Sequence, residues 1–217
     1  MIASLTASSS PSGGTDDNQN QYTVATSFLW GAGGLLCAFT FAKRSGSLTY
    51  SITPSRFQNS GFGLFLAEYS GVATFDFALS SRVQIRASSN CADQLAIVVA
   101  SSVGGVNLDS SFSTRLQHSG NFESKFADLT FSSSNQTIVS TQFLLSYDGC
   151  VMLLFRPTGP CLQERLSSTS LQHTTTPLIT SKRVTTVGVS LTTKPSLSAK
   201  IHVSKFLVLL CLVTFLQ

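Results

Sequence analysis

The sequence predicts an all-β protein whose strands form an antiparallel β-sandwich. Between Gly46 and Phe155, short apolar runs alternate with Gly, Ser, Asn and Pro, which mark turns, and the runs suffice for about seven or eight strands. The aromatic residues are mostly Phe, sixteen against four Tyr and one Trp, and many stand beside Ser or Thr, a pattern that favours strands. The region sustains no helical period, so a helical domain is not expected. The 217 residues allow one domain of ordinary size with tails.

The charge of the chain is low and unevenly placed. Charged residues make up 11% of the sequence and apolar residues 42%, whereas a cytosolic domain usually has about a quarter charged residues. Residues 1–165 carry nine Lys and Arg against ten Asp and Glu, a balance of −1, while residues 166–205 carry five cations and no acid. These cations are scattered through a polar segment without clustered aromatic residues, so nucleic acid is not an expected partner.

The N-terminal part has two segments of different character. Residues 1–23 are mostly Ser, Gly, Asp, Asn and Gln and are predicted to be disordered. Residues 24–42 contain no charge, and Lys43 and Arg44 follow them. This stretch is interpreted either as the first strand or two of the sandwich or as an internal signal. As a span it would make the chain a small integral membrane protein without a ligand-binding role, with the following part in the cytoplasm.

Residues 162–198 are predicted to form an extended Ser/Thr-rich stalk. Of the 35 residues from Leu166 to Lys200, 16 are Ser or Thr, and Pro177 and Pro195 interrupt the run. Such a segment buries too little apolar surface to fold by itself. Its composition is typical of O-glycosylated stalks, and an ordinary disordered tail is the alternative.

Residues 199–217 are interpreted as a glycosylphosphatidylinositol (GPI) signal. The end is apolar from Phe206 to Leu216 except for Thr214. The twelve terminal residues would reach only about 18 Å as a helix, too little for a hydrocarbon core of about 30 Å. Small residues precede a short polar spacer and this tail, which is the order that the signal requires. Ser198 is the preferred attachment residue and Ser196 the second choice. The protein is therefore expected on the extracellular face of the plasma membrane or secreted, although residues 1–22 carry no Lys or Arg for an entry signal. A tail-anchored or meaningless apolar end is the alternative.

The cysteines and one sequon agree with an oxidising compartment. Loss of Cys211 with the tail would leave four cysteines, an even number suited to two disulfides. The favoured pairs are Cys150–Cys161, which flank one strand and a turn, and Cys37–Cys91. Four buried thiols in a cytosolic core are the alternative. The sequon "NQT" predicts a glycan on Asn135.

Three segments of the strand region resemble CUB domains. They are "CAFTFAKRSGSLTYSI" (37–52), "NCADQLAIVV" (90–99) and "ADLTFSSSNQTIVSTQFLLSYDG" (127–149). The resemblance covers about residues 37–155 and implies a jelly-roll or CUB-like sandwich, whose domain we set at 37–161. The chain departs from the family between Ile52 and Arg86, where it is longer, and two expected cysteine partners are absent.

The resemblance does not extend to a calcium site. Asp93 matches one ligand position of calcium-binding CUB domains, but Ser134 stands where another acid would be expected, and "RASSN" (86–90) holds no acid. One carboxylate cannot satisfy a cation that takes six to eight oxygen ligands. No metal ion or other cofactor is expected.

The sequence predicts no enzyme. The three His residues are far apart, and phosphate-binding, dinucleotide-binding and serine-elbow motifs are missing. Asp109, Glu123 and Asp128 are interpreted as solvated loop carboxylates, and His118 as a surface loop residue. The expected function is a cell-surface binding or adhesion module that takes a protein or carbohydrate ligand through loops such as Ser101 to Asn121. A secreted enzyme with an unrecognised site is the third hypothesis.

Overall fold

All regular structure in the described residues is β-strand, and every strand pair is antiparallel. The computed structural model describes residues 12–15, 19–30, 33–43, 46–52, 60–119, 122–133, 136–139, 149–158, 180–190, 197–203 and 207–216. The prediction of an all-β protein with antiparallel sheets is confirmed.

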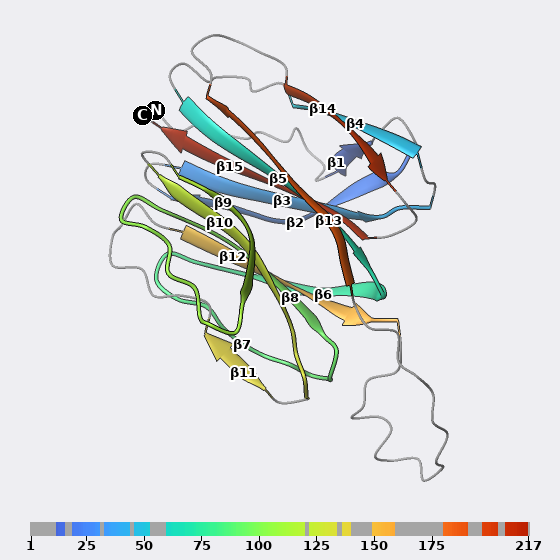
Figure 1. Cartoon of the computed structure of the whole chain (residues 1–217), viewed down its shortest axis with the longest axis vertical. Coiled ribbons are helices and arrows are strands. Elements are labelled where there is room, and N and C mark those ends of the chain that lie inside the picture. Colours follow the sequence, from blue (N-terminus) through green and yellow to red (C-terminus); the bar gives the residue numbers. More distant parts are fainter. Residues whose placement is uncertain are drawn as a thin grey trace.

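Two large sheets lie face to face and make the fold sandwich-like (Figure 1). The first sheet has the order β1 (Ser12–Thr15), β2 (Gln21–Trp30), β3 (Gly33–Phe41), β15 (Leu207–Leu216), β5 (Ser60–Ser70) and β13 (Thr180–Ser190). The second has the order β6 (Val72–Ser81), β12 (Gly149–Pro157), β8 (Leu95–Ser102), β10 (Glu123–Thr130) and β9 (Ser113–His118). Two smaller pairs accompany them: β7 (Arg86–Ser88) with β11 (Thr137–Val139), and β4 (Gly46–Ile52) with β14 (Leu197–Val203).

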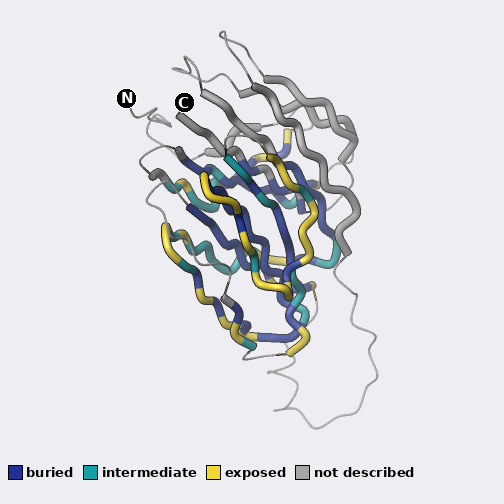
Figure 2. Tube along the Cα trace, turned by 60° about the vertical axis from the view of Figure 1, so that its left-hand side comes forward, coloured by how far each residue is buried: buried dark blue, intermediate teal, exposed yellow. Residues whose placement is uncertain are grey.

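The main core lies between the two large sheets. Alternate side chains of β3, β5 and β15 pack against alternate side chains of β8, β10 and β12, as the two-residue period of a strand requires. The rings of Phe39 and Phe155 meet across the sheets with centroids 5.5 Å apart, and those of Phe65 and Phe126 are 5.8 Å apart. Figure 2 shows the buried residues concentrated in the facing strands.

A second core covers the opposite face of the second sheet. Side chains of β8, β10 and β12 that point away from the first sheet pack against Val106, Phe112 and residues of β7 and β11. Every residue of β8 is therefore buried, whichever face it points to. Burial on both faces explains why "LAIVVA" is a continuous apolar run and does not alternate.

The apolar stretch 24–42 lies in two neighbouring strands. β2 and β3 pair antiparallel, with Thr23 opposite Phe39 and Trp30 opposite Gly33. The described part of the chain holds no helix of the length and hydropathy that a membrane span needs. The segment 1–23, expected to be disordered, contributes β1 and the start of β2 to the first sheet.

Parts of the predicted stalk also lie in strands. β13 pairs with β5 along the edge of the first sheet, and β14 pairs with β4. Ser198, the preferred lipid-attachment residue, lies on β14 opposite Ser51, while Ser196 lies outside the described residues. A Ser/Thr-rich segment that is too polar to form a core can still complete a sheet, because backbone hydrogen bonds and β-branched Thr suit an edge strand.

The apolar tail is a central strand. β15 lies between β3 and β5, and Leu207, Leu209 and Cys211 are buried in the main core. An uninterrupted apolar segment without a polar face is suited to the middle of a sheet. The tail was expected to be removed as a signal. In this fold it instead pairs with both β3 and β5 and contributes side chains to the main core.

Candidate ligand-binding cleft

A cleft of about 500 Å³ opens where β2 begins and β3 ends. These two strand ends lie together because β2 and β3 are neighbours in the first sheet (Figure 1). This volume lies within the range of about 300–1,000 Å³ that small-molecule sites occupy. The described residues that line it are Gln19, Asn20, Gln21, Thr23, Phe39, Thr40, Phe41 and Lys43. None of the residues named as candidate sites from the sequence lies in this lining.

A side-chain hydrogen bond links two residues of the cleft lining. Asn20 Oδ1 accepts a hydrogen bond of 3.0 Å from the backbone N–H of Lys43. This bond ties the segment before β2 to the segment after β3, and Asn20 and Thr40 are both buried there. Gln19 has a left-handed backbone with φ of 61°, which turns the chain as it enters β2. The main chain around the cleft is thus held from both strands.

The lining combines amides, hydroxyls, aromatic rings and one cation. Amide side chains offer both donors and acceptors, and the Thr hydroxyls offer either. Phe39 is buried against Phe75 and Phe155, and Phe41 meets it edge-on at 5.7 Å while staying partly exposed. Among the described lining residues Lys43 is the charged one, and no carboxylate accompanies it. This chemistry suits a hydroxyl-rich ligand that also has an apolar face.

A buried carboxylate joins the two sheets outside the cleft. Tyr69 of β5 donates a hydrogen bond of 2.9 Å to Asp128 Oδ2 of β10, and Arg115 of β9 forms an ion pair of 2.9 Å with Asp128. Burial, together with the neighbouring carboxylate and its hydrogen bond, raises the pKa of Tyr69 well above its ordinary value. The hydrogen bond to Asp128 raises the pKa of Arg115. Asp128 was expected to be a solvated loop residue; it is instead a buried strand residue whose charge is compensated.

The loop expected to bind a ligand is fastened onto the second sheet. Glu123 accepts a hydrogen bond from the backbone N–H of Val106, Lys125 donates one to the backbone carbonyl of Val106, and the two side chains form an ion pair of 3.3 Å. Val106 and Phe112 are buried under the loop. Glu123 is therefore a strand residue that anchors this loop, and not a solvated loop carboxylate.

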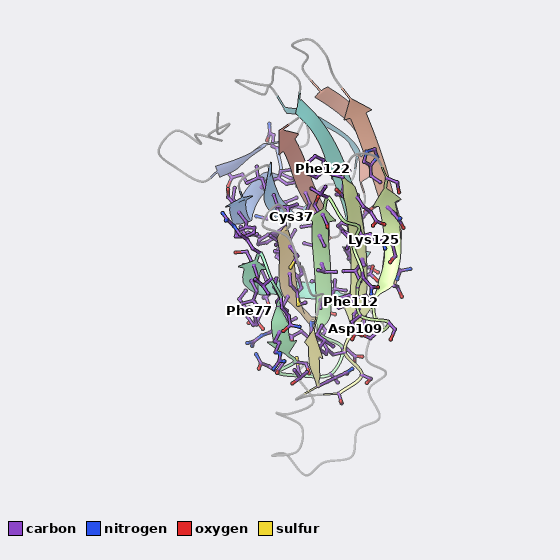
Figure 3. All side chains as sticks on the ribbon, turned by 90° about the vertical axis from the view of Figure 1, so that its left-hand side faces the viewer. Cys37, Phe77, Asp109, Phe112, Phe122 and Lys125 are labelled. Carbon is purple, nitrogen blue, oxygen red and sulfur yellow. A yellow bond between two sulfur atoms is a disulfide. The ribbon has the colours of Figure 1, made fainter. Side chains whose placement is uncertain are left out.

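Most of the described residues of the same segment are exposed. Asp109 is exposed beside Phe112 (Figure 3), and its hydrogen bonds from Ser111 lower its pKa. Arg115 and His118 lie on the exposed edge strand β9, so His118 is a strand residue and not a loop residue. Within residues 101–119, positions 101–102 and 113–118 thus form strands, and Val106 and Phe112 cover the second core.

A third polar cluster connects β6, β12 and the turn before β8 in the second sheet. Gln94 is fully buried just before β8 and donates a hydrogen bond of 2.8 Å to Asp76 on β6. Arg156 on β12 forms an ion pair of 3.0 Å with the other oxygen of Asp76. The backbone N–H of Asn90 donates to Gln94 Oε1 at 3.0 Å. Each of these groups has its partner inside the protein, so this cluster is structural.

The cysteine pairing differs from the expected one. Cys37 of β3 and Cys211 of β15 are directly opposite in the sheet and form a disulfide within the main core, with Cα atoms 4.2 Å apart (Figure 3). The pairing Cys37–Cys91 is therefore wrong. Cys91 is disulfide-bonded, Cys150 is a buried thiol on β12, and Cys161 lies outside the described residues. The error followed from discarding Cys211 with the tail.

The remaining candidate residues are not brought together. Asn135 and Ser134 lie outside the described residues. Asp93 lies in the turn before β8, where φ is 60° and its N–H donates to the carbonyl of Phe131 at 2.8 Å. Among the described residues, no three His, Cys, Asp or Glu side chains come close enough to hold a metal ion.

No family model, curated protein or solved structure matches the chain. By its fold and site it is an all-β, sandwich-like protein with a core disulfide and a polar, aromatic-lined cleft.

Proposed function

We propose that this protein is an extracytoplasmic binding module that takes a carbohydrate ligand in the cleft at the start of β2 and the end of β3. The observation that carries the proposal is the lining itself, in which amides and hydroxyls stand next to a partly exposed Phe41. A sugar ring has hydroxyls that both donate and accept hydrogen bonds and an apolar face that packs on an aromatic ring. The lining residues supply partners for both.

A carbohydrate fits the cleft better than a protein partner does. Protein interfaces bury about 800 Å² on each side and use exposed aromatic or Arg anchors. In the described residues the exposed large apolar side chains are Val83 and Val103, which lie away from the cleft. A concave, polar site of this volume suits one or a few sugar rings.

The cysteines support an oxidising compartment. Disulfides persist mainly in secreted and extracellular proteins, and Cys37–Cys211 is one within the core. In this proposal the C-terminal strand β15 stays in the mature protein, because its removal would separate β3 from β5 and break the disulfide. A GPI anchor attached at Ser198 is the alternative to this proposal, because its attachment would remove β15. The stalk, the CUB-like relationship and a glycan on Asn135 stay predictions from sequence.

The proposal is tested by screening the purified protein on a glycan array and measuring the binding of each hit by calorimetry. Phe41→Ala and Thr23→Ala should each weaken binding at least several-fold, because they remove an apolar surface and a hydroxyl from the lining. Thr114→Ala is the matched control, since Thr114 is also an exposed strand Thr but lies on β9. The absence of any glycan hit, or equal losses for Thr23→Ala and Thr114→Ala, would overturn the proposal.

A further inference from the structure

We infer that the carbohydrate bound in the cleft is acidic and that Lys43 recognises its carboxylate or sulfate group. The inference rests on the proposed function and adds the ligand's charge to it. Its basis is the placement in this cleft of one cation that no described residue neutralises.

Lys43 is presented at a fixed point of the cleft. Its backbone N–H is held by Asn20 Oδ1 at 3.0 Å, directly after β3, while the residue itself is exposed. The ammonium group can therefore reach an anion at the mouth, while the main chain beneath it stays in place. A Lys ammonium brings three donors and a full charge to such an anion.

The charge of Lys43 is not neutralised within the described part of the chain. The ion pairs there are Arg115–Asp128, Lys125–Glu123 and Arg156–Asp76. None of them involves Lys43, and the described lining of the cleft has no carboxylate. A cation that faces a cleft without a counter-charge raises the local concentration of anions and favours them over neutral ligands of the same shape.

The amides beside Lys43 fit the same ligand. Gln19 and Gln21 are exposed at the entry of β2 and lie in the same lining as Lys43. Their amide N–H groups can donate to the remaining anion oxygens, and their carbonyls can accept from sugar hydroxyls. Hydrogen bonds to a charged partner are stronger than neutral ones, so the anion should dominate selectivity.

The test compares pairs of oligosaccharides that differ in one group. A glucose-containing oligosaccharide is measured against its glucuronate and its sulfated counterparts by calorimetry with the full chain. Binding of either acidic form should be about tenfold tighter than that of the neutral form, as expected for one charge-assisted hydrogen bond. The carboxylated and sulfated arms identify which anion is preferred.

Three variants assign the preference to Lys43. Lys43→Gln should remove the tenfold preference without abolishing neutral binding, Lys43→Arg should keep most of it, and Arg86→Gln should leave it unchanged. Arg86 is an exposed cation on β7, so it controls for loss of net charge. Equal binding of neutral and acidic forms would overturn the inference and leave the proposed function standing. Failure to bind any member of the series would overturn both.

Discussion

At the scale of single residues, the polar side chains inside this protein do structural work that a sequence does not reveal. Asp128 and Glu123 read as ordinary surface carboxylates, yet Asp128 joins the two sheets and Glu123 anchors the loop over the second core. Their partners, Tyr69 and Val106, are 59 and 17 residues away in the chain. Such contacts depend on strand register, which local sequence patterns do not specify.

Ionisation of Tyr69 should make the protein sensitive to alkali. Its pKa is raised in the folded state by burial and by Asp128, so folding favours the neutral phenol. That stability is complete below the unfolded-state pKa of about 10 and is lost as the pH rises above it toward the folded-state pKa. Tyr69→Phe should cost about 1 kcal/mol at neutral pH, through the lost hydrogen bond, but should lose less stability between pH 8 and pH 11 than the wild type.

Urea titrations of both proteins across this pH range measure the difference directly. An ultraviolet titration of tyrosinate in the folded wild type should show one Tyr that ionises at a higher pH than the others. The same alkaline loss of stability in wild type and Tyr69→Phe would contradict the assigned role of Tyr69.

Gly105 should not tolerate a side chain. Its φ is +96°, and a Cβ there would lie 3.1 Å from Glu123 Oε2, the atom that accepts the hydrogen bond from Val106. Gly105→Ala should lower the free energy of unfolding by about 1–3 kcal/mol. Gly104→Ala, next to it in the chain, is the matched control and should cost less by at least a factor of two. Chemical denaturation of the two variants tests this, and equal effects would show that the loop is not fastened as described.

At the scale of elements, a sequence predicts a strand well where its apolar pattern is compatible with a strand and with no other kind of segment. "LAIVVA" was predicted as a strand and is β8, buried on both faces. The apolar tail "LVLLCLVTFL" has the same kind of pattern, but a continuous apolar run is also what a signal requires, and periodicity cannot separate the two. Its partner β3 lies more than 160 residues earlier, so nothing local indicated the pairing. β13 escaped prediction because its Thr-rich edge position needs little apolar surface.

Removal of β15 should prevent folding. A chain that lacks residues 207–217 loses the strand between β3 and β5 and leaves Leu35, Phe65 and their neighbours without cover. We expect this variant to show no cooperative thermal transition by circular dichroism. A cooperative transition close to that of the full chain would instead favour a removable C-terminal signal.

Loss of the disulfide alone should be milder. In the chain-entropy account, a cross-link spanning 174 residues stabilises a protein by about 5 kcal/mol, and measured losses are typically about 2–5 kcal/mol. Cys211→Ser should therefore fold but unfold at a lower denaturant concentration than the wild type. Cys150→Ser, at a buried thiol, is the control. Because it keeps Cys37–Cys211, its denaturation midpoint should fall when the sample is reduced. An unchanged midpoint would mean that this disulfide is absent. A wild type insensitive to reductant would contradict the role of the disulfide.

At the scale of the whole molecule, the fold class followed from composition and turn spacing, but the architecture did not. The sequence predicts an antiparallel sandwich whose domain ends at residue 161. The first sheet instead draws on β1, β13 and β15 from the segments taken as tails, and the cleft lies at the N-terminal border of the expected domain. The cleft was not predicted because Gln19 and Asn20 are far from Lys43 in the sequence. The pairing of β2 with β3 brings them together.

The most direct test of the account is disulfide mapping by mass spectrometry of the mature protein, isolated from the cells that make it. The account predicts a cross-linked peptide pair containing Cys37 and Cys211, with the sequence of β15 intact. A mature chain that ends near Ser198 and carries a lipid, or one in which Cys37 is linked to Cys91, would contradict it.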